Sequence, residues 1–133
     1  MRTTRVLVAV GLTLFAVPVA AQQQKSIAPG NYVLEVRDNS PVGQQYKGWK
    51  LEVKSDNSMA VSDGTQVFWA SDFSIKADTI QFVDRPGAQA CDASAVGRYT
   101  WKVVDGKVQF NAVSDACDGR RDGLTGVLLA KAP

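Results

Sequence analysis

The residues of this chain best suited to do chemistry are crowded into one stretch, VSDACDGRRDG at residues 113–123. Three aspartates, two adjacent arginines and a cysteine lie within it. Carboxylates at this density could hold calcium, and an arginine could anchor an anionic group. The aspartates are three and four residues apart, however, whereas an EF-hand loop places its acids two apart and closes with a glutamate. Two neighbouring arginines would also repel a cation, so we predict no metal site.

The same stretch is better interpreted as a structural corner of a small fold. Asp115 can accept backbone N–H bonds in a turn, and Asp118-Gly119 can bend the chain. An arginine can pair with an aspartate or lie over an aromatic ring. We therefore predict a corner formed by Asp115, Arg120 and Arg121. One alternative stays open, in which Arg120 anchors a ligand at the mouth of a barrel.

The composition argues against catalysis. The chain has no histidine, which is the usual general base and the commonest zinc ligand. Gly106-Lys107 is followed by valine and preceded by no glycine-rich loop, so a phosphate-binding motif is missing. A pair of carboxylates could serve glycoside hydrolysis, but 13 acidic residues offer many pairs and the sequence places none of them across a cleft. We expect no enzymatic activity and no cofactor.

The N-terminus has the pattern of a secretory leader. Arg2 and Arg5 precede a nearly unbroken apolar run over residues 6–20. Val19 and Ala21 then occupy the −3 and −1 positions of a cleavage site. The apolar run is shorter than the ~20 residues of a membrane-spanning helix. We therefore expect export to the periplasm or the medium, without stable membrane insertion of the mature chain.

This interpretation divides the chain into three parts. Residues 1–21 are the expected signal peptide, residues 22–29 a flexible N-terminal segment, and residues 30–133 a single domain. The chain has 15 basic and 13 acidic residues, and two of the basic ones belong to the leader. The mature protein would therefore carry 13 charges of each sign. A neutral protein has no net field to attract nucleic acid, so we expect no nucleic-acid partner.

The two cysteines indicate a disulfide. Cys91 and Cys117 are the only pair in a chain directed to an oxidising compartment. A bond between them would close a loop that the chain-entropy model values at roughly 3–4 kcal/mol. A redox role would favour the closer CxxC spacing, which the chain lacks.

Apolar and polar residues alternate along most of the mature chain. Strict alternation is typical of half-buried antiparallel strands, because successive side chains point to opposite faces of a sheet. No segment of the mature chain shows convincing helical spacing. Asp105-Gly106 predicts a tight type I′ hairpin. The expected strand segments are residues 30–37, 48–54, 58–63, 65–70, 72–76, 79–84, 97–104, 107–113 and 124–131.

Short strands at regular intervals predict an all-β fold, and consecutive hairpins favour an eight-stranded antiparallel up-and-down barrel. Closure removes exposed sheet edges, and a barrel of this size can hold packed side chains or one small ligand. An immunoglobulin-like sandwich is the alternative. Its usual cysteine–tryptophan–cysteine order fits poorly, because Trp101 follows Cys91 by only ten residues in what looks like the next hairpin.

A family resemblance adds to this prediction. It rests on an ordered set of features within residues 78–120: Asp84, Gly87, Cys91, the run Gly97-Arg98-Tyr99-Thr100-Trp101, the Asp105-Gly106 hairpin, Phe110, and the ending Asp115-x-Cys117-x-x-Arg120. This order resembles a group of small exported bacterial proteins with lipocalin-like (calycin) barrels, most of them uncharacterised. The resemblance covers about a third of the chain and implies fold and export rather than a particular ligand.

A detail of the lipocalins proper is also relevant. Their first strand begins with G-x-W, and an arginine from near the last strand covers that tryptophan. Here Gly30-Asn31-Tyr32 stands in that place. The resemblance therefore implies that Arg120 or Arg121 lies over the ring of Tyr32.

The aromatic residues are candidates for either the core or a binding site. Trp49 begins its strand after a polar loop at residues 38–47, where a barrel mouth with a lid could lie. Phe68 and Trp69 are neighbours, so alternation predicts that one points inward and the other outward. As candidate ligand-binding residues we name a set of four: Trp49, Tyr99, Trp101 and Arg120.

Three functions are compatible with these features. The first is an exported lipocalin-like barrel that binds a small apolar or amphipathic molecule. The second is a protein-binding module, such as an inhibitor of a secreted protease, with residues 22–29 entering the protease cleft. The third, an enzyme, has the least support. A cavity in the barrel favours the first, and loss of a protein partner on deletion of residues 22–29 favours the second.

Overall fold

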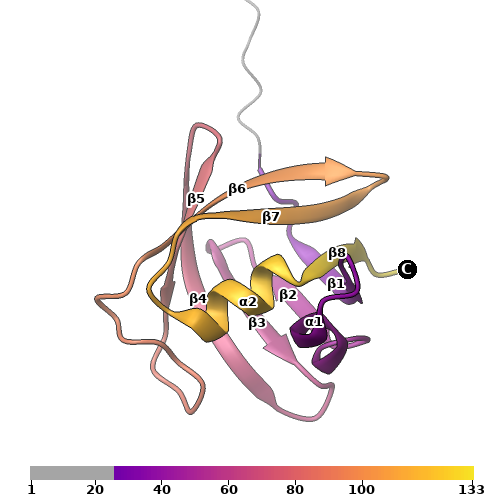
Figure 1. Ribbon diagram of the computed structural model, residues 1–133, viewed down its shortest axis with the longest axis horizontal. Helices are drawn as coiled ribbons and strands as arrows, with labels where there is room; N and C mark the ends of the chain where they lie inside the picture. The colour runs from indigo at the N-terminus through magenta and orange to yellow at the C-terminus, as the bar shows by residue number, and fades with distance from the viewer. Residues whose placement is uncertain (1–25) are drawn as a thin grey trace, which may run out of the picture.

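The computed structural model describes residues 26–133. The signal peptide predicted at residues 1–21 and the adjoining residues 22–25 lie outside the described residues. Eight antiparallel strands, each paired with its neighbours in sequence, form a closed barrel (Figure 1). The elements in order are β1 (Gly30–Val36), α1 (Pro41–Gln45), β2 (Lys50–Val53), β3 (Ser58–Ser62), β4 (Val67–Lys76), β5 (Thr79–Asp84), β6 (Gly97–Val104), β7 (Lys107–Ser114), α2 (Asp118–Thr125) and β8 (Val127–Lys131).

The predicted all-β, eight-stranded up-and-down barrel is confirmed. β1 pairs with β8 from Tyr32↔Lys131 to Val36↔Val127, which closes the sheet and excludes the open two-sheet sandwich. Alternation works as expected in β5, where Ile80 and Phe82 are fully buried. The Asp105-Gly106 turn has positive φ at both residues, at 51° and 77°, as a type I′ turn requires.

Two strand predictions are wrong in detail. Residues 65–70 and 72–76 belong to one continuous strand, β4, and this is why the barrel has eight strands. Alternation along residues 97–104 predicts that Val103 points inward with Tyr99 and Trp101, yet Val103 is 64% exposed. β5 pairs with β6 only as far as Thr100, so the end of the β6–β7 hairpin extends beyond its neighbour and leaves Val103 without a core to enter.

The expectation that the mature chain contains no helix is also wrong, because α1 and α2 lie side by side over one end of the barrel (Figure 1). In α1 the Ser40 side chain accepts a hydrogen bond from the Gly43 N–H at 3.0 Å, and proline occupies the first turn. α2 takes two residues, Leu124 and Thr125, from the strand predicted at 124–131. No helix within residues 26–133 has the length and apolar character needed to cross a lipid bilayer.

The contact between the two helical segments depends on glycine. A Cβ atom at Gly43 would lie 2.1 Å from the carbonyl oxygen of Gly126, and one at Gly126 would lie 2.5 Å from Ser40 Oγ. Only glycine therefore allows α1 to approach the junction between α2 and β8 this closely.

The two ends of the barrel are built differently. Tight turns at residues 54–57, 77–78 and 105–106 lie at one end, which we call the hairpin end. Longer connections at residues 37–49, 63–66, 85–96 and 115–126 lie at the other, which we call the loop end and which carries both helices.

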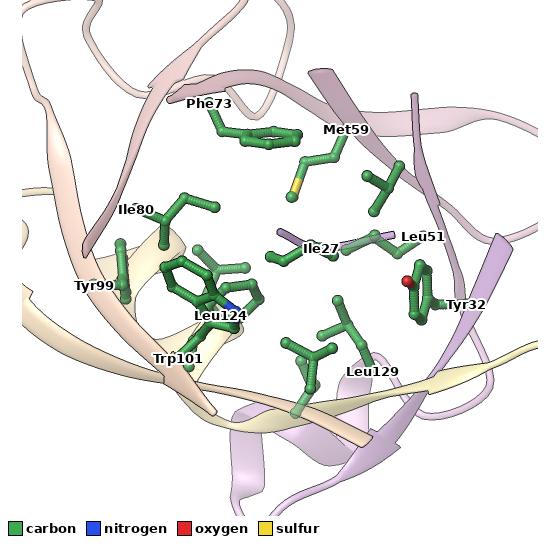
Figure 2. Packing of buried hydrophobic residues seen from close by; sticks show 14 of the residues in the cluster. Ile27, Tyr32, Leu51, Met59, Phe73, Ile80, Tyr99, Trp101, Leu124 and Leu129 are labelled. Atoms are coloured by element: carbon green, nitrogen blue, oxygen red, sulfur yellow. The ribbon is translucent and has the colours of Figure 1, made fainter. Parts of the chain in front are cut away.

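The core fills the hairpin end. Figure 2 shows Ile27 at the centre of a ring of inward-pointing side chains that includes Leu51, Met59 and Leu129. Ile27 is only 5% exposed, although it precedes the first strand. The Tyr32 hydroxyl donates to the Ala28 carbonyl at 2.6 Å and holds this segment in place. Residues 22–29 were expected to be flexible, yet within the described residues of that segment Ile27 is packed inside the barrel.

We predict that Ile27→Ala lowers the free energy of unfolding by about 2–5 kcal/mol, because it removes buried methyl groups and leaves a cavity at the hairpin end. Urea denaturation measures this difference. The control is Val67→Ala, which shortens a side chain that is 63% exposed and should change stability by about 0.5 kcal/mol or less. Equal effects of the two substitutions would show that Ile27 is not part of the core.

Candidate functional site

An apolar cavity of about 300 Å³ opens at the loop end. Its floor is the part of the barrel interior nearest the loop end. The residues that form this floor are Leu34, Leu51, Val61 and Val127. These residues come from β1, β2, β3 and β8, so four different strands meet beneath it. The cavity therefore lies inside the barrel mouth rather than on its outer surface.

Aromatic side chains form one wall of this cavity. The ring of Trp49 lies edge-on to that of Tyr46, with centroids 5.1 Å apart, and at 4.6 Å from that of Phe68 with a tilt of 38°. Trp69 lines the same space and packs against the core through Phe82, at 6.2 Å between centroids. Four aromatic rings are thus gathered at one mouth.

The prediction that Phe68 and Trp69 point to opposite faces is wrong, because both line the cavity. Val61 pairs with Trp69, but the next residue of β3, Ser62, pairs with Val67. Phe68 is therefore an extra residue without a partner on β3, as in a β-bulge. The bulge turns a side chain that alternation would direct outward toward the barrel mouth.

The polar groups of the cavity are few and uncharged. Gln45 and Gln89 are at its edge, and no Asp, Glu, Lys or Arg is among its lining residues. Within residues 26–133, Trp69 Nε1 is the one buried side-chain nitrogen or oxygen without a hydrogen-bond partner. A buried donor left unpaired costs about 1–3 kcal/mol.

α2 forms the remaining side of the cavity through Gly119, Gly123 and Leu124. Arg120 and Leu124 are both buried, and their spacing of four residues places them on the same face of the helix. Leu124 joins the core, whereas Arg120 enters a polar cluster. The position of α2, and with it the shape of the cavity, depends on these two side chains.

The guanidinium of Arg120 joins α2 to three other parts of the chain. It donates to Asp115 through Nε at 2.7 Å and through Nη2 at 2.8 Å. It also donates to Asp84 Oδ1 at 2.9 Å and to the Ala95 carbonyl at 2.5 Å. The three charged side chains are each 1% exposed or less. This cluster of Arg120, Asp84 and Asp115 is called the arginine clamp below.

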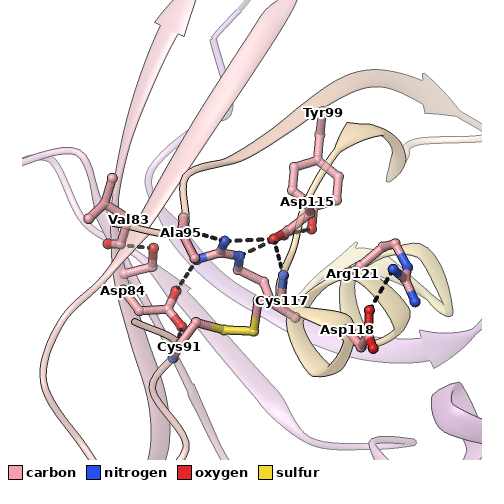
Figure 3. The surroundings of a disulfide bond; sticks show 11 residues. Val83, Asp84, Cys91, Ala95, Tyr99, Asp115, Cys117, Asp118 and Arg121 are labelled. Carbon is pink, nitrogen blue, oxygen red and sulfur yellow. Dashed lines mark hydrogen bonds and ion pairs between the residues drawn. A yellow bond between two sulfur atoms is a disulfide. The ribbon is translucent and has the colours of Figure 1, made fainter. Parts of the chain in front are cut away.

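The disulfide lies beside the arginine clamp, and its two cysteines donate hydrogen bonds to the clamp carboxylates. Figure 3 shows the Cys91–Cys117 bond between Asp84 and Asp115. The Cys91 N–H donates to Asp84 and the Cys117 N–H to Asp115, each at 2.8 Å. The predicted disulfide is therefore confirmed, and both cysteines supply backbone donors that a pair of buried carboxylates needs.

Tyr99 and Gly97 complete the clamp from β6. The Tyr99 hydroxyl donates to Asp115 Oδ2. A Cβ atom at Gly97 would lie 2.5 Å from that oxygen and 2.9 Å from Arg120 Nε, so the ion pair fits only over a glycine. Gly97 therefore serves packing rather than backbone flexibility.

The clamp changes the pKa values of its members. Burial, and then the hydrogen bond to Asp115, raise the pKa of Tyr99 far above its ordinary value, so the hydroxyl stays a donor. Burial would lower the pKa of Arg120, but hydrogen bonds to Asp115 and Asp84 outweigh it and raise that pKa. Burial would raise the pKa of Asp115, but hydrogen bonds from Arg120, Tyr99 and Cys117 lower it below its ordinary value.

Of the four residues predicted to bind a ligand, Trp49 lines the cavity. Tyr99 is fully buried and bonded to the clamp, Trp101 is a core residue 7% exposed, and Arg120 points into the clamp. None of these three is among the residues that line the cavity. Arg120 therefore belongs to the predicted corner rather than to the cavity, because both its carboxylate partners lie within the fold.

In the stretch predicted to be a corner, Asp115 and Arg120 are bonded to each other. Arg121 lies on the other face of α2, where it pairs with Asp118 at 2.7 Å and with Asp122 at 3.0 Å. The expectation that one of these arginines covers Tyr32 is wrong, because Lys131 lies over that ring at 5.3 Å from its centroid. Tyr32 is at the hairpin end, whereas α2 is at the loop end.

Several residues of the cavity were not predicted from the sequence. Tyr46 and Gln45 belong to the segment expected to be a lid, and the Ser40-Pro41 start of α1 is a signal that could have placed them on a helix. Leu124 was assigned to a strand, although its spacing of four from Arg120 is helical. Within residues 26–133, no three Asp, Glu, Cys or His side chains are grouped to hold a metal ion.

The fold and the cavity define a closed antiparallel β-barrel with an uncharged, aromatic-lined pocket at one end. Comparison with known proteins finds no match to this chain among family models, curated proteins or solved structures. The function is therefore argued from the site itself.

We predict that Arg120→Met lowers the free energy of unfolding by about 3–5 kcal/mol, because it leaves two carboxylates buried without a counter-charge. Urea denaturation at pH 7 is the measurement. The matched control is Arg121→Met on the neighbouring residue, whose ion pairs are exposed and screened by solvent, so this variant should be nearly as stable as the original protein. If both variants were equally stable, the clamp would not hold α2.

Acid should weaken the clamp at Asp115. Its pKa is lower in the folded protein than the value of about 3.9 expected in the unfolded chain. Its contribution to stability is therefore complete above that value and is lost as the pH falls through the folded pKa. We predict that Asp115→Asn is less stable than the original protein at pH 7 and that this difference shrinks below about pH 4. Urea denaturation from pH 7 to pH 2 tests it, and a constant difference would contradict it.

Proposed function

We propose that this protein is an exported, lipocalin-like barrel that binds a small apolar or amphipathic molecule in the cavity at its loop end. The observation that carries the proposal is the cavity of about 300 Å³ within the barrel mouth. Ligand pockets are mostly apolar, with a few polar groups for orientation, and span about 300–1,000 Å³. The uncharged lining and the two glutamines at the rim fit that description at the small end of the range.

The surrounding structure also supports a preformed pocket. α2 is tied to the barrel by the arginine clamp, and the loop that carries Gln89 is closed by the disulfide. The cavity walls are thus fixed by buried interactions before any ligand arrives, and a preorganised site binds with a smaller entropic cost.

Export is part of the proposal and rests on two features. The leader pattern at residues 1–21 is typical of a secretory signal, and the disulfide is of a kind that persists in oxidising compartments. The resemblance of residues 78–120 to small exported bacterial barrels points the same way.

A protease inhibitor that acts through residues 22–29 stays a prediction. Within the described residues of that segment, Ile27 is 5% exposed and Ala28 is held by Tyr32. Entry of this segment into a protease cleft would require Ile27 to leave the barrel core, so ligand binding has the better structural support.

Filling the cavity from α2 tests the proposed function. Gly123 lines the cavity, and a Cβ atom there would meet Tyr46 at 3.7 Å, an ordinary contact. We predict that Gly123→Leu occupies the cavity and weakens binding of naphthalene and 1-octanol at least about tenfold, because the apolar space is lost. Binding is followed by the NMR signals of the Trp49 and Trp69 indole N–H groups.

The matched control is Gly123→Ala, which fits the available space and should leave binding within about twofold. Both substitutions remove a helical glycine and should not destabilise α2, since glycine is the poorer helix former by about 1 kcal/mol. Binding of neither molecule to the original protein, or equal binding to the leucine variant, would overturn the proposal.

A further inference from the structure

The cavity also indicates what kind of molecule it takes. Given the proposed function, on which this step rests, we propose that the ligand is an uncharged molecule with a flat one- or two-ring aromatic system. The inference comes from three properties of the cavity: its volume, the arrangement of its rings, and the absence of charge in its lining.

The volume sets the size of the ligand. A dry apolar cavity of about 150 Å³ can bind benzene. A space of about 300 Å³ therefore accommodates one or two fused rings, whereas extended acyl chains or multi-ring lipids would exceed it. The hairpin end offers no extension, because Ile27, Met59 and Leu129 fill it.

The aromatic wall favours a flat ligand. Trp49, Phe68 and Trp69 line the space with aromatic surface, and aromatic pairs in stacked or edge-to-face contact gain about 0.5–1.5 kcal/mol beyond the burial of area. The rings of Trp49 and Phe68 stack on each other, with centroids 4.6 Å apart and a tilt of 38°, so a flat ligand contacts the remaining aromatic surface of this wall. A puckered aliphatic ring could contact this surface but could not stack on it.

The charge of the lining favours a neutral ligand. No carboxylate, ammonium or guanidinium lines the cavity, so a charged ligand would be buried without a partner. A cage of aromatic faces can bind a quaternary ammonium ion. Here the Trp49 ring already contacts Tyr46 and Phe68, at 5.1 and 4.6 Å between centroids. These rings pack on each other and do not surround a space of cation size.

The experiment compares four molecules of similar size at pH 8, where quinoline is uncharged. Quinoline and naphthalene are flat and uncharged, N-methylquinolinium adds a permanent positive charge, and 2-decalone is uncharged but puckered. Titrations are followed by the indole N–H signals of Trp49 and Trp69, with the core residue Trp101 as an internal reference. We expect quinoline to bind at least about tenfold more tightly than N-methylquinolinium and 2-decalone.

The outcomes separate this inference from the proposed function. If 1-octanol and 2-decalone bind as tightly as quinoline, the cavity binds ligands but does not select flat rings, and the inference fails alone. If N-methylquinolinium binds most tightly, the uncharged class is wrong. If none of these molecules moves the Trp49 and Trp69 signals, the proposed function fails as well.

Discussion

The structure depends on one buried interaction, the ion pair of Arg120 with Asp84 and Asp115. Without it, α2 would rest on the barrel mainly through Leu124, since the helix is short and contains two glycines. A buried ion pair contributes little net stability compared with apolar packing, but breaking one is costly. Its effect is therefore positional: it specifies where α2 crosses the barrel mouth. Lysine could not replace it, because Arg120 uses a planar, multidentate donor set.

The clamp is coupled to the covalent structure of the protein. Each cysteine of the disulfide donates its backbone N–H to one of the two clamp aspartates. The loop between β5 and β6, which contributes Gln89 to the cavity, is thus held by the disulfide and by the Arg120 bond to Ala95. The same interactions that stabilise this end of the fold also shape the mouth of the cavity.

The interior of the barrel is divided between packing and space. The hairpin end is filled by side chains from the strands and by Ile27, which enters from outside the sheet. The loop end is spanned by helices, whose glycines at 119 and 123 leave room beneath them. A β-bulge at Phe68 adds one more aromatic ring to that space than regular alternation allows. A barrel can in this way have a solid core and a pocket at the same time.

The sequence by itself determined most of the strands, the closed barrel and the disulfide. Alternation has a period of two that is visible in residues such as Ile80 and Phe82, and the Asp105-Gly106 turn has a local requirement for positive φ. It also marked residues 113–123 as a corner. These features follow from local chemistry or from composition, and both can be recognised in the amino-acid sequence alone.

Only the tertiary structure decided the site. Arg120 meets Asp84 across 36 positions of the chain, and Ile27 is buried because a closed barrel has an interior to receive it. The bulge that directs Phe68 inward arises from the pairing of β3 with β4, not from the sequence of β4 alone. Helix α2 has weak intrinsic helical propensity and is formed by contacts of its buried face. Long-range contacts of this kind have no local period or spacing, and this is the physical reason why the sequence predicts the barrel but not its pocket.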